Sequence, residues 1–186
     1  MILLVGLGNP TPDSNDNRHN VGFKIIDAIN QKFGLSKQKP KFKGLLTTGN
    51  IANKKVYAIK PLTFMNNSGI CIRELMEYFK IDIDDVIVFH DDLDIDFGKI
   101  KAKFGGSSAG HNGIESIDKF IGKEYSRVRV GIGKADKIIP VSDYVLNNFN
   151  EEEIIQLGQI TTNIIESIPI LIDNKLDLFS STVNNK

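Results

Sequence analysis

Ile2-Leu3-Leu4-Val5-Gly6 begins the chain as an unbroken apolar run, and the turn-forming residues Gly8 and Pro10 close it. A short apolar run bounded by glycine and proline is typical of a buried strand. We therefore predict the first strand of a sheet over residues 2–6. A long loop is expected to follow, up to the next periodic segment at Val21.

Two helices and a hairpin are predicted in the first half of the chain. Apolar residues recur at helical spacing over residues 21–33, after Asn20 as the expected N-cap, and a second helix is expected to be capped by Asn67 or Ser68. Residues 45–51 and 56–59 flank the turn signal Ala52-Asn53-Lys54-Lys55, which predicts an antiparallel hairpin.

The second half continues the alternation of strands and helices. Strands are predicted at 86–89, 99–104 and 127–132, and helices at 114–120 and from 151 onwards. Together with the first half, this order predicts an α/β fold in a single domain over residues 1–186, with a mixed sheet between helices.

The composition is that of an ordinary globular protein. Of the 186 residues 41% are apolar and 25% are charged, and no low-complexity tract is present. The apolar run at the N-terminus ends at Gly6, far short of a signal-peptide core or a membrane span, so we expect a cytoplasmic protein that makes no contact with a membrane. The one cysteine, Cys71, excludes an internal disulfide and is expected to be a small core residue.

The net charge is zero, but its distribution is uneven. Residues 138–186 contain seven acidic residues and two lysines, a net charge of −5, so residues 1–137 carry +5. Two stretches alternate basic residues at the period of a strand, and each set is expected to project from one face: Lys99, Lys101 and Lys103, and Arg127 and Arg129. Such stripes can bind phosphates, but without a substrate motif nearby a solvated strand face is the preferred interpretation.

All three histidines stand next to an acid or an amide, in Arg18-His19-Asn20, His90-Asp91-Asp92 and Gly110-His111-Asn112-Gly113. An imidazole takes up and returns protons near neutral pH, and a neighbouring carboxylate can fix its tautomer. Because ligands bind outside the carboxyl ends of parallel strands, the three segments are expected to converge at one rim of the sheet. This pattern indicates a hydrolytic site, and the alternative is that Asx-rich loops bring these residues together by chance.

Two other motifs are weaker. Gly6-Leu7-Gly8-Asn9-Pro10 lacks the third glycine and the following helix of a dinucleotide-binding fingerprint. The acidic run from His90 to Asp94 offers metal ligands, but in an extended segment His90 and Asp92 point to one side and Asp91 to the other. We therefore expect no metal site.

Six sequence blocks, taken together, resemble the bacterial-type peptidyl-tRNA hydrolases in order and approximate spacing, over almost the whole chain. They are Gly6-Leu7-Gly8-Asn9-Pro10, Arg18-His19-Asn20-Val21-Gly22, Thr63-Phe64-Met65-Asn66, His90-Asp91-Asp92-Leu93-Asp94, Gly110-His111-Asn112-Gly113 and Arg127-Val128-Arg129-Val130-Gly131-Ile132-Gly133. The resemblance implies a single α/β domain with a twisted mixed sheet flanked by helices. It also implies hydrolysis of the ester between a peptide and the terminal ribose of tRNA, without metal or cofactor, which recycles tRNA from aborted translation. The expected partner is peptidyl-tRNA, with the enzyme acting as a monomer.

The resemblance also implies roles for individual residues. It makes His19 the general base that activates water and Asp91 the carboxylate that orients it. Lys103 and Arg129 match basic residues that clamp a tRNA phosphate, which reverses the preference for a solvated face. The residues that match substrate-binding positions are the amides Asn9, Asn66 and Asn112, the channel wall Met65, and His111 at the mouth of the site.

The sequence departs from the family pattern at three places, Ser14, Ser107-Ser108-Ala109 and Lys134-Ala135. None of them is the base or its partner, so we expect activity. Two other classes stay open, an RNA-binding relative that has lost catalysis and a metal-assisted hydrolase on a similar scaffold. Both His19 and Asp91 are present, which argues against the first, and removal of metal by a chelator discriminates against the second.

Overall fold

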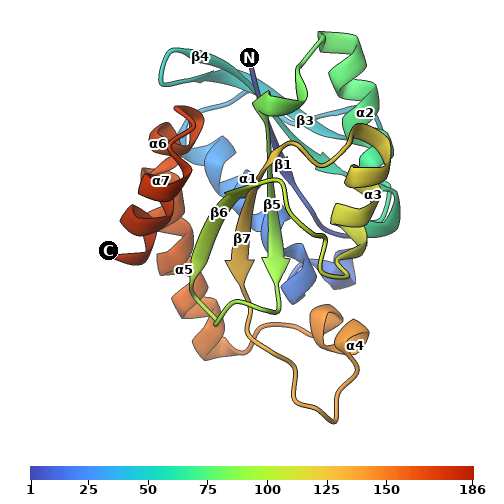
Figure 1. Ribbon diagram of the computed structural model, residues 1–186, viewed down its shortest axis with the longest axis vertical. Coiled ribbons are helices and arrows are strands. Elements are labelled where there is room, and N and C mark those ends of the chain that lie inside the picture. Colours follow the sequence, from blue (N-terminus) through green and yellow to red (C-terminus); the bar gives the residue numbers. More distant parts are fainter.

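The protein is built around a seven-stranded sheet, described by a computed structural model that covers residues 1–186 (Figure 1). The strand order is β2-β3-β4-β1-β5-β7-β6. The strands are β1 (Ile2–Gly6), β2 (Lys39–Lys41), β3 (Gly44–Ile51), β4 (Lys54–Pro61), β5 (Val86–Asp92), β6 (Ile100–Phe104) and β7 (Ser126–Gly131). Strands β4, β1, β5 and β7 run parallel, whereas β2, β3 and β6 join by antiparallel pairing, so the mixed sheet and the hairpin at residues 44–61 are confirmed.

Helices cover both faces of this sheet, as expected for an α/β domain. They are α1 (Val21–Lys32), α2 (Ser68–Phe79), α3 (Asn112–Ile121), α4 (Val141–Leu146), α5 (Glu151–Glu166), α6 (Ile168–Ile172) and α7 (Leu176–Asn184). One face packs against α1, α5, α6 and α7, and the other against α2 and α3 (Figure 1). None of the helices combines the length and the apolarity needed to cross a membrane.

The first strand lies in the middle of the sheet, and all five of its residues are buried. Leu3 and Val5 pack toward α2 and α3, while Ile2 and Leu4 pack into the core on the opposite face. The continuous apolar run of the sequence therefore serves two cores at once, because neighbouring side chains of a strand point to opposite faces.

Two glycines bring the start of α1 against the end of β1. A side chain at Gly6 would overlap the main chain of Gly22, and a side chain at Gly22 would overlap the Leu7 amide and the Phe89 carbonyl group. The approach places the turn before α1 next to the carboxyl end of β5. His19 and Asp91 are brought together in this way.

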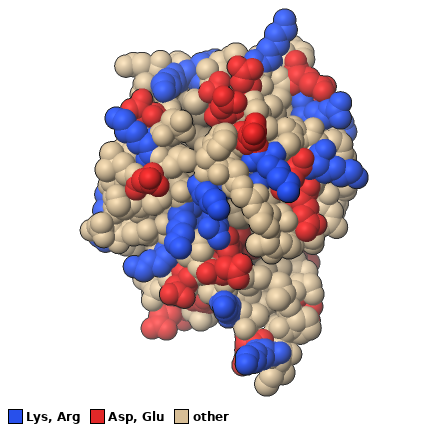
Figure 2. Space-filling view, viewed as in Figure 1, with Lys and Arg blue, Asp and Glu red and all other residues tan.

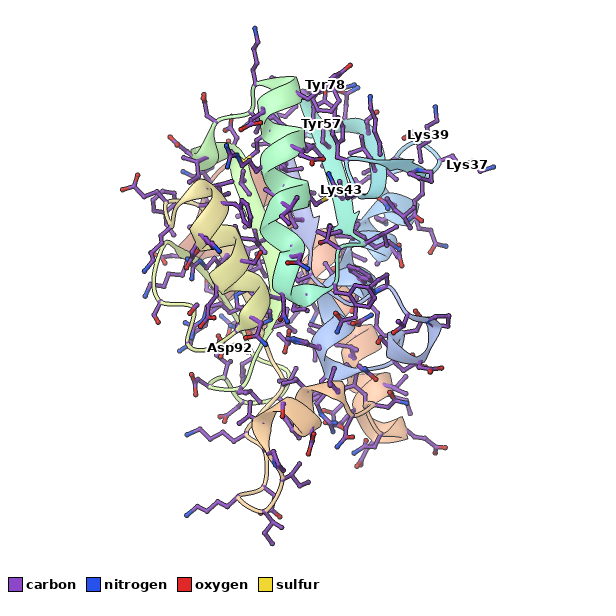
Figure 3. All side chains as sticks on the ribbon, turned by 90° about the vertical axis from the view of Figure 1, so that its right-hand side faces the viewer. Lys37, Lys39, Lys43, Tyr57, Tyr78 and Asp92 are labelled. Carbon is purple, nitrogen blue, oxygen red and sulfur yellow. The ribbon has the colours of Figure 1, made fainter.

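Basic and acidic side chains are interspersed over much of the surface, as the zero net charge requires, and basic side chains gather over β6 (Figure 2). The opposite edge of the sheet is also basic. Lys39-Pro40-Lys41 forms the edge strand β2, where Lys37 and Lys39 point away from the molecule (Figure 3). Lysine and proline on an edge strand prevent pairing with other chains, and this explains the composition of β2.

Asn20 and Asn67 occupy the N-cap positions of α1 and α2, as predicted, but neither side chain makes a capping hydrogen bond. Asn20 precedes α1, but its side chain bonds the main chain of Asn9 instead of the helix. Neither Asn67 nor Ser68 caps α2, because Asn67 makes no capping bond and the Ser68 hydroxyl donates to the Met65 carbonyl oxygen. The sequence also gave no indication of β2, α4, α6 or α7, which are short or lack a clear period.

Candidate active site

The three histidines converge at the carboxyl edge of the parallel strands, as the rim geometry predicted. His19 lies in the short 3-10 helix η2 (Arg18–Asn20), immediately before α1. His90 lies within β5, and His111 is the residue directly before α3. The ring centroids of His19 and His111 are 4.8 Å apart, and those of His90 and His111 are 5.0 Å apart. Strand β5 is longer than expected, so His90 and Asp91 belong to the strand and do not follow it.

His19 and Asp91 form a buried pair. The Nδ1 atom of His19 lies 3.0 Å from Oδ1 and 2.9 Å from Oδ2 of Asp91. Only 6% of His19 and 2% of Asp91 is exposed. Because a carboxylate can only accept, Nδ1 carries a proton, and in the neutral form of the ring Nε2 therefore has the free lone pair. His19 also lines two cavities, so this lone pair is placed to act as a base.

Asp91 is held in its ionised form. Burial by itself raises the pKa of the carboxyl group, but His111 and His19 beside it more than offset this effect, so the pKa lies below its ordinary value. A negative charge is therefore present next to His19 at neutral pH.

His111 approaches Asp91 from the other side. Its Nε2 atom lies 2.9 Å from Oδ1 of Asp91, and its Nδ1 accepts from the main-chain nitrogens of Gly113 and Ile114 at the start of α3. The resemblance placed this residue at the mouth of a substrate site. In the structure both of its ring nitrogens have partners within the protein.

His90 has a different environment. Its Nδ1 donates to the Asp91 carbonyl oxygen over 2.8 Å, and its buried Nε2 has no partner. Burial and the neighbouring His111 lower the pKa of His90 to about 3, so the ring is neutral at physiological pH.

His19, Asp91 and His111 are close enough to be considered as metal ligands, since one ligand atom of each lies within 4.8 Å of the others. The hydrogen bonds of His111 disfavour that use. A metal on Nε2 would move the ring proton to Nδ1, where two main-chain N–H groups already point.

A cavity of about 360 Å³ lies on one side of His19 and contains most of the expected substrate residues. The residues from the sequence prediction that line it are Asn9, Met65, Asn66 and Asn112. The Asn9 side-chain oxygen accepts from the Met65 main-chain nitrogen over 2.9 Å, which leaves the Asn9 amide NH2 as a donor. Ser14 lines the same cavity and bonds the hydroxyl of Thr11.

His19 also lines a second cavity, of about 300 Å³. It is bordered by His90, Asp92, His111, the loop at 108–110 and Val141 and Val145 of α4. Asn112 and Val145 line both cavities, so α4 and the start of α3 form a common wall. The contribution of α4 was missed because residues 141–146 are too short to show a helical period.

The basic stripes are only partly available to a ligand. Arg127 is 2% exposed and bonds Asp118 and the Ser107 carbonyl oxygen, so it anchors the loop before His111. Arg129 is partly exposed and its Nε donates to Asp92 over 2.8 Å. Lys103 is exposed and its ammonium group lies beside Gly106. The face shared by Arg127 and Arg129 therefore contains one structural and one accessible arginine.

Arg18 is a residue of the site that the sequence did not reveal. Its guanidinium donates to Glu153 over 3.0 Å and to the Asn148 carbonyl oxygen over 3.0 Å, and it lies 4.3 Å from the ring centre of Tyr144. These contacts tie the residue next to His19 to the segment that joins α4 and α5. In the sequence, only its position directly before His19 could have indicated that Arg18 belongs to the site.

The fold and the site have the features of a hydrolase, since a buried His–Asp pair facing cavities lined by neutral amides is the arrangement that general-base hydrolysis requires. A sequence model of peptidyl-tRNA hydrolases matches residues 3–186. The chain is 78% identical to a peptidyl-tRNA hydrolase of Pelagibacter ubique over the full length of both proteins. It is 45% identical to the enzyme of Bacillus subtilis over 82% of each chain.

The fold leads to the same relatives. The crystal structure of peptidyl-tRNA hydrolase from Acinetobacter baumannii superimposes with a TM-score of 0.92 at 31% identity, and the match covers 99% of this chain and 94% of the other. This chain belongs to the peptidyl-tRNA hydrolase family. The resemblance found in the sequence is thereby confirmed.

Proposed function

We propose that this chain hydrolyses the ester bond between a peptide and the 3′-terminal ribose of tRNA, and so recycles peptidyl-tRNA released from ribosomes during translation. The observation that carries the proposal is the buried His19–Asp91 pair beside a cavity lined by amides. The family membership supplies the substrate.

The chemistry needs one base and one stabilised charge. His19 Nε2 takes a proton from water while the water oxygen attacks the ester carbonyl carbon, and the imidazolium that forms is stabilised by the charge of Asp91. The tetrahedral intermediate then expels the ribose oxygen, which takes the proton back from His19. The products are the hydroxyl group of tRNA and the carboxylic acid of the peptide, which releases its proton to the solvent.

Neutral amides serve this reaction better than cations. Asn9, Asn66 and Asn112 can donate to the peptide carbonyl groups and to the developing oxyanion without attracting free phosphate. The strongest support is the fixed orientation of Asn9, whose oxygen is occupied by Met65 and whose amide NH2 remains available. Met65 is buried and forms an apolar part of the cavity wall.

Lys103 and Arg129 are assigned to a phosphate of tRNA. They lie on adjacent strands, and Arg129 is a neighbour of the cavity through its partner Asp92. Arg129 is already paired in the free protein, so the contribution of Lys103 is expected to be the larger one. The enzyme acts in the cytoplasm, as a monomer, without a metal ion or cofactor.

The decisive experiment compares two substrates that share a tRNA. The purified chain should release peptide from a peptidyl-tRNA and should leave the matching aminoacyl-tRNA, with its free amino group, largely intact. Cleavage of neither substrate at micromolar enzyme would contradict the proposal. Equal cleavage of both would identify a less selective esterase.

A further inference from the structure

His111 occupies the space between the start of α3 and Asp91. Its Nδ1 lies 3.1 Å from the nitrogen of Gly113 and 3.3 Å from that of Ile114, while its Nε2 lies 2.9 Å from Oδ1 of Asp91. The side chain is 9% exposed. Every polar atom of the ring is therefore used inside the protein.

These partners determine the tautomer of His111. A main-chain N–H can only donate, so Nδ1 must present its lone pair and Nε2 must carry the proton. Asp91 imposes the same choice from the other end, because an ionised carboxylate can only accept. The α3 helix has ten residues, and the partial positive charge at its N-terminus strengthens the ring as a donor to Asp91.

We propose that His111 is a positioning residue that holds the Asp91 carboxylate in place for His19, and that the N-terminus of α3 fixes the tautomer this task requires. Asp91 Oδ1 accepts from both His19 and His111. Two donors, one on each ring, prevent the carboxylate from turning away from His19. The expected effect of His111 on catalysis rests on the proposed function, whereas its tautomer follows from the hydrogen bonds alone.

The expected substrate contact by His111 fits the structure less well. A hydrogen bond from the ring to a substrate would require the loss of an existing bond to Asp91 or to α3. The side chain is also nearly covered. Its effect on the reaction is therefore expected to pass through Asp91.

Two substitutions separate the two contacts of His111. In His111→Asn the shorter side chain still caps α3, since asparagine is among the best N-cap residues, but it does not reach Asp91. In His111→Ala both contacts are lost. Both variants should lower kcat on peptidyl-tRNA about tenfold to hundredfold, as expected for the loss of one buried hydrogen bond to a charged group, with KM nearly unchanged. His111→Ala should lower Tm further than His111→Asn, because it also loses the cap of α3.

A double-mutant cycle with Asp91→Ala tests whether His111 acts through the carboxylate. In the Asp91→Ala background, His111→Asn should cause no further loss of kcat. An equal loss in both backgrounds, together with a raised KM, would overturn the proposal in favour of a substrate contact. An unchanged kcat in His111→Asn would also overturn the proposal, because the cap of α3 would then be enough for full activity without the contact to Asp91. That result would not contradict the proposed function.

The tautomer can be measured without any substrate. Nitrogen-15 spectra of the imidazole rings at neutral pH should show the proton of His111 on Nε2 and that of His19 on Nδ1. A proton on Nδ1 of His111 would overturn the proposal whatever the activity of the chain.

Discussion

The two ring nitrogens of His19 have different roles. Nδ1 is hydrogen-bonded to Asp91, and Nε2 has no such partner and is available to accept a proton from water. His19→Ala removes the only base placed between the two cavities. We expect kcat on peptidyl-tRNA to fall about a hundredfold to ten-thousandfold, the usual contribution of a positioned general base. Retention of more than about a third of the activity in a folded variant would exclude this role.

His90 gives the protein a pH-dependent stability. Its pKa is lowered to about 3 by burial in the folded protein, against about 6.5 in an unfolded chain. Between these values only the unfolded state binds the proton, so the free energy of unfolding falls as pH falls below about 6.5, by up to about 1.4 kcal/mol per pH unit. Above that pH the residue has no such effect.

The variant His90→Asn tests this dependence. Asparagine keeps a donor for the Asp91 carbonyl oxygen but does not titrate. Urea unfolding of both proteins between about pH 4 and 6.5 should show a shallower pH dependence in the variant. Identical slopes would mean that His90 is protonated in the folded protein over this range.

Among the elements, the junction between α4 and α5 depends on Arg18. Its side chain is 11% exposed, and its removal leaves the Asn148 carbonyl group without a donor and Glu153 with only the main-chain N–H of Asn150. We expect Arg18→Ala to lower the free energy of unfolding by about 1–3 kcal/mol and to increase hydrogen exchange in α4. Because α4 lines both cavities, kcat/KM should fall as well.

Arg73→Ala is the matched control for Arg18. Arg73 pairs with Glu77 on the exposed side of α2, and an exposed pair of this type contributes about 0.3–0.5 kcal/mol. If Arg18→Ala and Arg73→Ala had the same free energy of unfolding and the same hydrogen exchange in α4, the contacts of Arg18 would not stabilise the junction between α4 and α5.

The strands β6 and β7 carry the residues assigned to tRNA phosphate. Lys103→Gln and Arg129→Gln should each weaken tRNA binding and reduce the salt dependence of binding by about one unit of slope. Lys55→Gln, at the exposed hairpin end of β4, changes the net charge equally and should leave the slope unchanged. If the salt dependence of tRNA binding were unchanged in Lys103→Gln and Arg129→Gln, both residues would be part of a solvated strand face that does not bind tRNA.

For the whole molecule, the site predicts independence from metal ions. The ring proton of His111 and the two main-chain donors at its Nδ1 disfavour a metal on this cluster. Dialysis against EDTA should therefore leave cleavage intact, once the magnesium that tRNA needs for its own fold is restored. Loss of activity that only zinc or manganese restores would establish the metal-assisted hydrolase instead.

The sequence determined every strand except β2, together with the helices α1, α2, α3 and α5, because these elements depend on local periodicity. The apolar run Ile2–Gly6 predicted a buried strand, and residues 151–166 showed acidic residues at the start of a helix, which forms with a capping box between Asn150 and Glu153. The family motifs also identified His19 and Asp91, whose proximity the structure shows.

The tertiary structure decided what each polar side chain binds. Asn20 is an adequate N-cap by type, yet it bonds Asn9, and Arg127 and Arg129 alternate identically, yet only Arg127 is buried against Asp118. His111 matched a substrate residue, although its two nitrogens are held by α3 and Asp91. A sequence motif gives the type and spacing of residues, whereas burial and hydrogen-bond partners depend on segments that only the folded chain brings together.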